Sequence, residues 1–206
     1  MIQMKAIFIA TLLALCNFVY AQQNTEFKEI KDYFDSQKSL LKTEFQKKYL
    51  AENNPLKKDK IKADYKDFVQ KIDSVKNVAY LGALIRVKNT EDLKKVVHHP
   101  EVKMDNQEVE KPEFPNGINS LREKVAELFY ADGICCDDKE LNTTLKFVVE
   151  KDGSISEITA EGKTPSFNKQ AEIALYLLSD KFQKPGTVNG NAVRYVFRMP
   201  IRMRLE

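Results

Sequence analysis

Tryptophan is absent from this chain of 206 residues, histidine occurs twice and cysteine three times. Glycine and proline contribute only seven residues each, which excludes collagen-like and low-complexity chains. No apolar run reaches the ~18–20 residues that a membrane-spanning helix needs. Phosphate-binding motifs of the GxGxxG and GxxxxGK types are missing. The two histidines, His98 and His99, are adjacent with no third ligand at metal-site spacing, so neither a metal site nor a catalytic triad is expected.

Neither sign of charge is in large excess. Lys and Arg number 33 against 30 Asp and Glu, a balance too even for an obligate nucleic-acid binder. Hydrophobic residues make up 43% and charged residues 31%, so the chain can bury a core and stay soluble. At ~100–200 residues per domain, this length predicts one ordinary domain, or a small domain plus a helical segment.

Residues 1–21 have the three parts of a signal peptide. Lys5 supplies the positive charge, residues 6–15 are almost entirely apolar, and Val19-Tyr20-Ala21 precedes a cut before Gln22. The alternatives are a buried helix or an uncleaved anchor, and lipid attachment at Cys16, which the bulky residue before it disfavours. The pattern therefore predicts export to the periplasm without a membrane span in the mature protein.

Two cysteines, Cys135 and Cys136, remain after the predicted cut. Their Cα atoms are 3.80 Å apart in any trans peptide, below the usual range for an unstrained disulfide. With Asp137 and Asp138 they offer soft and hard metal ligands, but four consecutive residues cannot close a tetrahedron without distortion. A metal-binding protein or an enzyme is therefore only the third hypothesis, and we predict no catalytic residue, metal or cofactor.

Residues 22–97 are predicted to form a basic helical hairpin. One helix is expected over Thr25–Leu50 and a second from Lys57, joined by a turn at Pro55. The two apolar stripes are Phe27, Ile30, Phe34, Leu41 and Phe45 in the first helix and Ile61, Tyr65, Phe68, Ile72, Val75 and Ala79 in the second. Both stripes are interpreted as core, and the lysines as a solvated face.

The end of this segment fits more than one assignment. The apolar run from Val78 to Val87 fits either a longer second helix or a strand, and Gly82 weakens both assignments. Asn89 or Thr90 could cap a short helix over residues 91–97. Residues 98–111 are polar and are predicted to be a linker to a domain over residues 112–206.

The C-terminal segment contains stretches with the spacing of a helix and stretches with the alternation of a strand. The pattern predicts a helix over 116–130, a strand around 144–149, a turn at Asp152-Gly153 and a returning strand to about residue 160. The segment ends with a helix and a strand. The helix is capped by Ser166 and its apolar face reaches Phe182, and the last strand covers 193–205. We therefore expect an α+β fold in which two helices pack on a three-stranded antiparallel sheet after the N-terminal hairpin.

The last strand suggests a binding surface. Tyr195, Phe197 and Ile201 are expected to face the core, since alternate residues of a strand share one side. The opposite face then carries Arg194, Val196, Arg198, Arg202 and Arg204. These arginines either keep an exposed strand soluble or select an acidic partner.

Three pieces of this segment, in order, carry a family resemblance. They are Pro112-Glu113-Phe114-Pro115-Asn116-Gly117, then residues 147–155 (FVVEKDGSI), then Phe182-Gln183-Lys184-Pro185-Gly186 followed by Asn189-Gly190. Together, residues 112–204 resemble the TonB C-terminal domain in the form common in exported proteins of Bacteroidetes-type bacteria. The family usually has Trp at the position of Phe182.

The resemblance implies binding and not catalysis. In the family, this domain takes up a short segment of an outer-membrane receptor as an added strand at a sheet edge. The expected function is a periplasmic protein-interaction module with a peptide or protein partner, such as a TonB-dependent receptor. The alternative is an anchored TonB-type energy transducer for receptor transport, although the inner-membrane anchor and the proline-rich spanner of that family are missing here.

Overall fold

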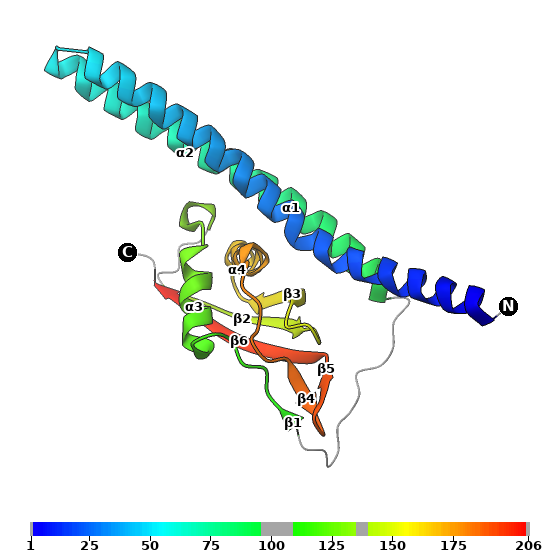
Figure 1. Ribbon diagram of the computed structural model, residues 1–206. Helices are drawn as coiled ribbons and strands as arrows, with labels where there is room; N and C mark the ends of the chain where they lie inside the picture. The colour runs from blue at the N-terminus through cyan, green and yellow to red at the C-terminus, as the bar shows by residue number, and fades with distance from the viewer. Residues whose placement is uncertain (1, 96–108, 135–139, 205–206) are drawn as a thin grey trace.

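The computed structural model contains the two packed helices that the apolar stripes predict (Figure 1). α1 spans Ile2–Ala51 and α2 spans Pro55–Lys95. The structure describes residues 2–95, 109–134 and 140–204, without the side chains of 2–24 and 94–95. In the part of the chain so described, no helix is both long and apolar enough to cross a bilayer.

The turn between the two helices follows from its own residues. The Asn54 side-chain oxygen accepts a hydrogen bond from the Leu56 N–H at 2.9 Å, which caps α2, and Pro55 occupies the first helical position. The Glu52 carboxylate accepts from the N–H of Asn53 and of Asn54. These local bonds fix the reversal that lets the two stripes meet.

The hairpin differs from the prediction at its ends. α1 begins at Ile2 and not at Thr25. The ambiguous run from Val78 to Val87 is helical, and α2 continues to Lys95, so the prediction of a separate short helix is wrong. No proline interrupts this stretch, and a single glycine costs a helix only about 1 kcal/mol.

The remaining residues build a sheet with helices on one side, so the predicted α+β class is confirmed. The main sheet is antiparallel with the order β3–β2–β6, and a second small sheet has the order β1–β4–β5. The bounds are β1 Val109–Glu110, α3 Gly117–Glu127, the 3-10 turn η1 Ala131–Gly133, β2 Glu140–Val149, β3 Ile155–Gly162, α4 Pro165–Leu177, β4 Gly186–Val188, β5 Asn191–Val193 and β6 Tyr195–Arg204.

The second sheet and the exact ends of several elements were not predicted. Strands of two or three residues are too short to show alternation, so β1 falls in the predicted linker and only Val193 of β5 falls in a predicted strand, the last one. α4 begins at Pro165, one residue before the proposed cap Ser166, and ends at Leu177. Phe182 is therefore outside the helix, although it is buried.

One apolar core extends from the sheet into the hairpin, with α4 between them (Figure 1). The Phe27 ring is fully buried and stacks on Tyr176 of α4 at 5.0 Å and on Tyr80 of α2 at 6.0 Å. Ala83, Leu84 and Val87 of α2 belong to the same cluster. The apolar core therefore contains residues from both sides of the predicted linker at residues 98–111.

The rest of the hairpin, residues 36–75, extends beyond the body and is called the projecting arm (Figure 1). Its seam contains Phe45 stacked on Tyr65 at 4.4 Å. Phe68 and Val75 were predicted as core, but they are 55% and 58% exposed. Two helices can cover only part of each other, so the outer half of a wide apolar stripe has nothing to pack against.

Candidate partner-binding surface

The two edges of the main sheet differ. The outer edge of β3 faces α2 and α4, and their side chains take up its backbone groups. Lys88 donates to the Ile158 carbonyl, Glu91 accepts from the Glu157 N–H at 3.2 Å, and Glu172 accepts from the Ala160 N–H at 2.7 Å. These contacts close the edge to any further strand.

A buried acid, Glu91, and a partly buried one, Glu172, hold this closed edge. Glu91 is 4% exposed and also accepts a hydrogen bond from the Tyr176 hydroxyl at 2.8 Å. Burial, and then the neighbouring Glu91 charge, raises the pKa of Tyr176, so its hydroxyl stays a donor. Burial also raises the pKa of Glu172, against the opposing effect of Lys88 3.5 Å away. The hairpin is therefore joined to the sheet by specific polar bonds as well as by apolar packing.

The opposite edge belongs to β6, which pairs with β2 along all ten of its residues. Among the described residues, no strand pairs with its other side. Pro200 lies in the middle of this strand, opposite Thr144, and the pairing continues in register on both sides of it. A proline is tolerated there when its nitrogen faces away from the neighbouring strand. Since backbone groups alternate, Val196, Arg198, Arg202 and Arg204 then direct N–H donors to the free edge.

The side chains of β6 follow the predicted alternation. Met199 is fully buried and Tyr195, Phe197, Ile201 and Met203 are partly buried, whereas the even-numbered residues from Val196 to Arg204 are exposed. The proposed residues Val196, Arg198, Arg202 and Arg204 therefore share one open face of the sheet, as expected from the period of a strand.

Arg198 is the least compensated cation of that face. It lies directly opposite Lys146 of β2, and like charges in this position repel. Neither side chain forms an ion pair with another described residue. Lys146 was missed as a site residue, although its place in the alternating run of β2 would have put it on this face. The pair forms a positive centre beside the free edge.

Arg194, in contrast, is held in place by two acids. It lies between β5 and β6 and binds Glu150 through two bonds of 2.9 Å and Glu157 at 2.6 Å. The hydrogen bonds to Glu150, followed by the one to Glu157, raise the pKa of Arg194 above its ordinary value. Glu157 has a left-handed backbone (φ 50°) at the irregularity of the β2–β3 pairing. Arg194 therefore braces the sheet and has little freedom to bind a partner.

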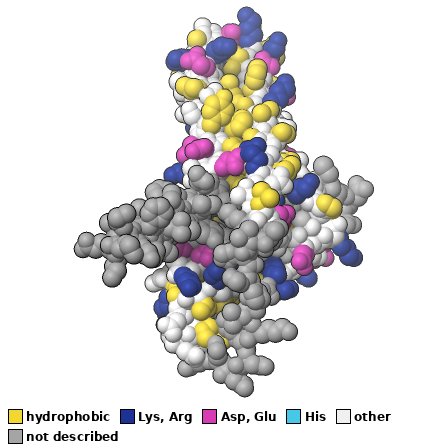
Figure 2. Space-filling model, turned by 90° about the vertical axis from the view of Figure 1, so that its right-hand side faces the viewer, with side chains coloured by type: hydrophobic (Ala, Val, Ile, Leu, Met, Phe, Trp, Pro, Cys, Tyr) yellow, Lys and Arg dark blue, Asp and Glu magenta, His cyan; other side chains and the backbone are white. Residues whose placement is uncertain are grey.

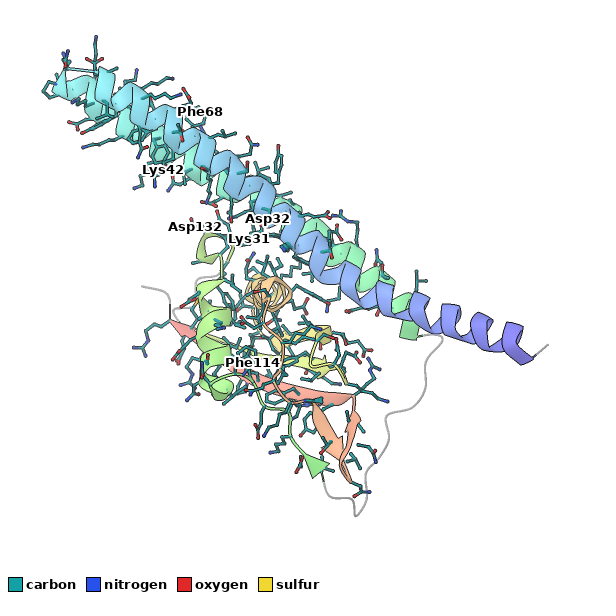
Figure 3. All side chains as sticks on the ribbon, in the orientation of Figure 1. Lys31, Asp32, Lys42, Phe68, Phe114 and Asp132 are labelled. Carbon is teal, nitrogen blue, oxygen red and sulfur yellow. The ribbon has the colours of Figure 1, made fainter. Side chains whose placement is uncertain are left out.

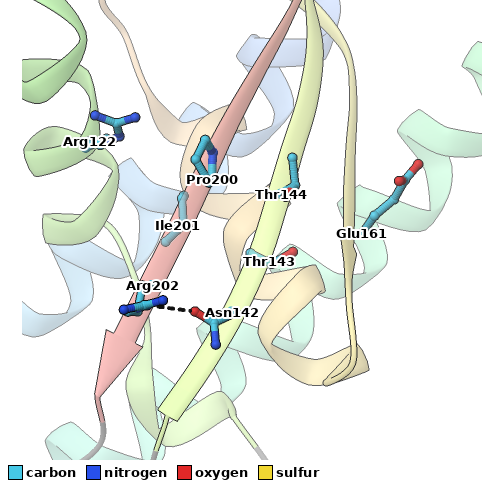
Figure 4. A pocket seen from close by; sticks show the side chains of 8 residues that line it. All are labelled: Arg122, Asn142, Thr143, Thr144, Glu161, Pro200, Ile201 and Arg202. Atoms are coloured by element: carbon cyan, nitrogen blue, oxygen red, sulfur yellow. Dashed lines mark hydrogen bonds between the residues drawn. The ribbon is translucent and has the colours of Figure 1, made fainter.

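Arg202 lies at a shallow depression of about 480 Å³ near the end of the sheet (Figure 4). Its guanidinium donates to Asn142 at 3.1 Å and is 3.3 Å from the Glu140 carboxylate, yet the side chain is largely exposed. The lining residues are Arg122, Asn142, Thr143, Thr144, Glu161, Pro200, Ile201 and Arg202. Arg122 of α3 brings a further cation to this end of β6. The depression is polar and open, and suits a peptide more than a buried small molecule.

A second depression, of about 410 Å³, lies where the segment before α3 approaches β6. Phe114, Phe182 and Phe197 form its aromatic part, with ring centroids 5.3 Å apart for Phe114 and Phe182 and 5.8 Å for Phe182 and Phe197. The Glu113 and Lys184 backbones pair beside it. The first and third sequence pieces of the family resemblance thus meet here, a juxtaposition that no spacing in the sequence revealed.

Metal chemistry finds no support in the part of the chain that the structure covers. No group of three or more His, Cys, Asp or Glu side chains there could hold a metal ion. The run from Cys135 to Asp138 and the His98-His99 pair lie outside the described residues.

Comparison of the chain with known protein families, with curated proteins and with solved structures gives no match. The open sheet face and the free β6 edge are therefore interpreted from their own geometry.

Proposed function

We propose that this chain is an exported cell-envelope module that binds an extended segment of a protein partner by strand addition at β6. The observation that carries the proposal is the difference between the two sheet edges. The β3 edge is occupied by Lys88, Glu91 and Glu172, whereas the β6 edge has no partner strand among the described residues. Strand addition requires only the free N–H and C=O groups of such an edge.

The side chains along the edge indicate what kind of segment fits. One side of an added strand would lie near Arg198 and Lys146, which favour acidic residues. The other side would lie near the aromatic depression at Phe114 and Phe197, which favours an apolar residue. Pro200 interrupts the donors at the centre, so two short hydrogen-bonded stretches are expected instead of one long one.

The charge contribution can be tested with the double variant Arg198→Ser/Arg202→Ser. Both side chains are exposed, so the free energy of unfolding should change by only ~0.5 kcal/mol. Capture of the partner from an envelope extract should weaken at low salt, and the difference from wild type should shrink as salt rises. Quantitative mass spectrometry of the captured proteins measures both effects.

The matched control is Lys163→Ser/Lys169→Ser, which removes the same charge from exposed positions away from β6. It should capture the partner as the wild type does. If the arginine variant also captures normally at low salt, then the arginines only keep the strand soluble and the contact lies elsewhere.

The export part of the proposal has its own test. Residues 1–21 are expected to be absent from the protein isolated from the cell envelope, because their pattern is that of a cleaved signal. Intact-mass spectrometry should find Gln22 at the N-terminus. An intact Met1 would favour the anchored transducer instead, and a lipid on Cys16 would identify a lipoprotein.

A further inference from the structure

The hairpin carries a row of exposed apolar side chains that the proposed strand addition does not use. We define the outer stripe as Tyr33 and Leu40 of α1 with Phe68, Val75 and Val78 of α2. Their exposed fractions are 60%, 60%, 55%, 58% and 65%. Figure 2 shows hydrophobic side chains gathered along the hairpin, with lysines at their margins. The largest contiguous apolar patch on a soluble protein is often a functional contact surface.

The outer stripe lies on the side of the hairpin that faces away from the body. In Figure 3, Phe68 is on the upper margin of the arm, whereas Lys31 and Lys42 are on the side of the body. Val75 is seven residues after Phe68 and shares its face. Tyr33 is two residues after Lys31, and Leu40 is two residues before Lys42. A step of two residues turns about 200° around a helix, so Tyr33 and Leu40 lie on the side of α1 opposite these lysines. Side chains from both helices therefore form one continuous face.

The charges around the stripe are already paired within the hairpin. Glu26, which is seven residues before Tyr33 and so on the same face of α1, forms an ion pair with Arg86 of α2. A second pair joins Lys71, whose ammonium lies over the Phe68 ring, to Asp67 at 2.7 Å. The middle of the hairpin is therefore nearly neutral and does not repel an identical surface.

The tip of the hairpin is different. Residues 47–66 contain seven lysines and three acidic residues. Two copies aligned with their tips together would bring these positive charges into contact, which costs free energy at low salt. Two copies that run in opposite directions keep the tips apart and still superimpose the neutral centres.

We propose that the outer stripe is the contact surface of a symmetric dimer in which the hairpins of two copies pack side by side in opposite directions. A two-fold axis makes the same patch meet itself, so an apolar, charge-neutral stripe is self-complementary. The patch measures about 20 Å by 20 Å, since each helix is about 10 Å wide and rises 1.5 Å per residue. This area is below that of a standard interface, so the proposed dimer is a weak one. The free β6 edges remain available in the dimer.

The first experiment measures the oligomeric state of the purified chain by sedimentation velocity from about 1 to 100 μM, a range that brackets a micromolar Kd. The wild type should pass from monomer to dimer. The variant Leu40→Glu/Phe68→Glu should weaken the dimer at least tenfold, because it buries two charges per copy. The matched control, Leu50→Glu/Leu56→Glu, changes residues at the tip that are even more exposed, at 78% and 80%, and should leave dimerisation unchanged.

The second experiment tests the orientation by disulfide cross-linking in a chain whose Cys16, Cys135 and Cys136 are replaced by Ser. Val75→Cys lies near the two-fold axis and should cross-link to its counterpart. Leu56→Cys should not, because opposite orientation places the two tips on the order of 50 Å apart. Cross-linking at the tip alone would overturn the orientation.

A wild type that stays monomeric to 100 μM would overturn the dimer itself. So would a stripe variant that dimerises as the wild type does while its circular dichroism shows an intact fold. Neither outcome bears on strand addition, which is read from partner capture by the β6 variants.

Discussion

The Phe27→Ala variant is expected to lose about 3–5 kcal/mol of its free energy of unfolding, the usual cost of deleting a fully buried aromatic ring. Phe27 is 0% exposed and its ring lies between those of Tyr80 and Tyr176. Its removal leaves a cavity at the point where α1, α2 and α4 meet. Because Tyr176 also bonds the buried Glu91, the contacts that close the β3 edge should loosen too. Urea denaturation followed by circular dichroism measures the loss.

The matched control is Phe45→Ala in the projecting arm. Phe45 stacks on Tyr65 but is only partly buried, so the same substitution should cost about 1 kcal/mol. A Phe27→Ala variant that is no less stable than the Phe45→Ala variant would show that the hairpin does not share the core. In that case, residues 112–206 would fold independently of it.

Strong periodicity explains which parts of the fold could be predicted. The ten residues of β6 alternate throughout, and both their burial and the open arginine face follow the prediction. The hairpin was recognised from its spacing of three and four residues. The same spacing could not tell which apolar residues the second helix would cover, so Phe68 and Val75 were assigned to the core although they are exposed.

The features that define the binding surface depend on contacts between distant residues. Glu91 and Lys88 precede the backbone groups they bind by 66 and 70 residues, and no local pattern predicts that α2 would close the β3 edge. The opposition of Lys146 and Arg198 depends on strand register, which the sequence of either strand alone does not specify. The alternation of the strand does not distinguish Arg194 from the other arginines, because its ion pairs with Glu150 and Glu157 arise only in the folded chain.

A proline scan of β6 should give opposite results at two adjacent positions. At Phe197, paired with Phe147 in the middle of the ladder, the N–H faces β2. Phe197→Pro removes that bond and a ring from the aromatic cluster, so it should cost roughly 3 kcal/mol or more. At Val196 the N–H faces the free edge, where Pro200 is already tolerated. Val196→Pro should therefore keep the fold but abolish one of the donors that an added strand needs.

Side-chain controls separate the backbone effect from the loss of the side chain. Val196→Thr and Phe197→Leu keep their N–H groups, so the former should capture the partner normally and the latter should stay folded. Thermal unfolding measures the stability, and capture from an envelope extract measures the binding. If Val196→Pro unfolds the protein while Phe197→Pro does not, then the backbone groups of β6 face the opposite way from that inferred from Pro200. If Val196→Pro folds and still captures the partner fully, then the Val196 N–H is not one of the donors that an added strand uses, because proline removes the N–H and keeps only the carbonyl acceptor.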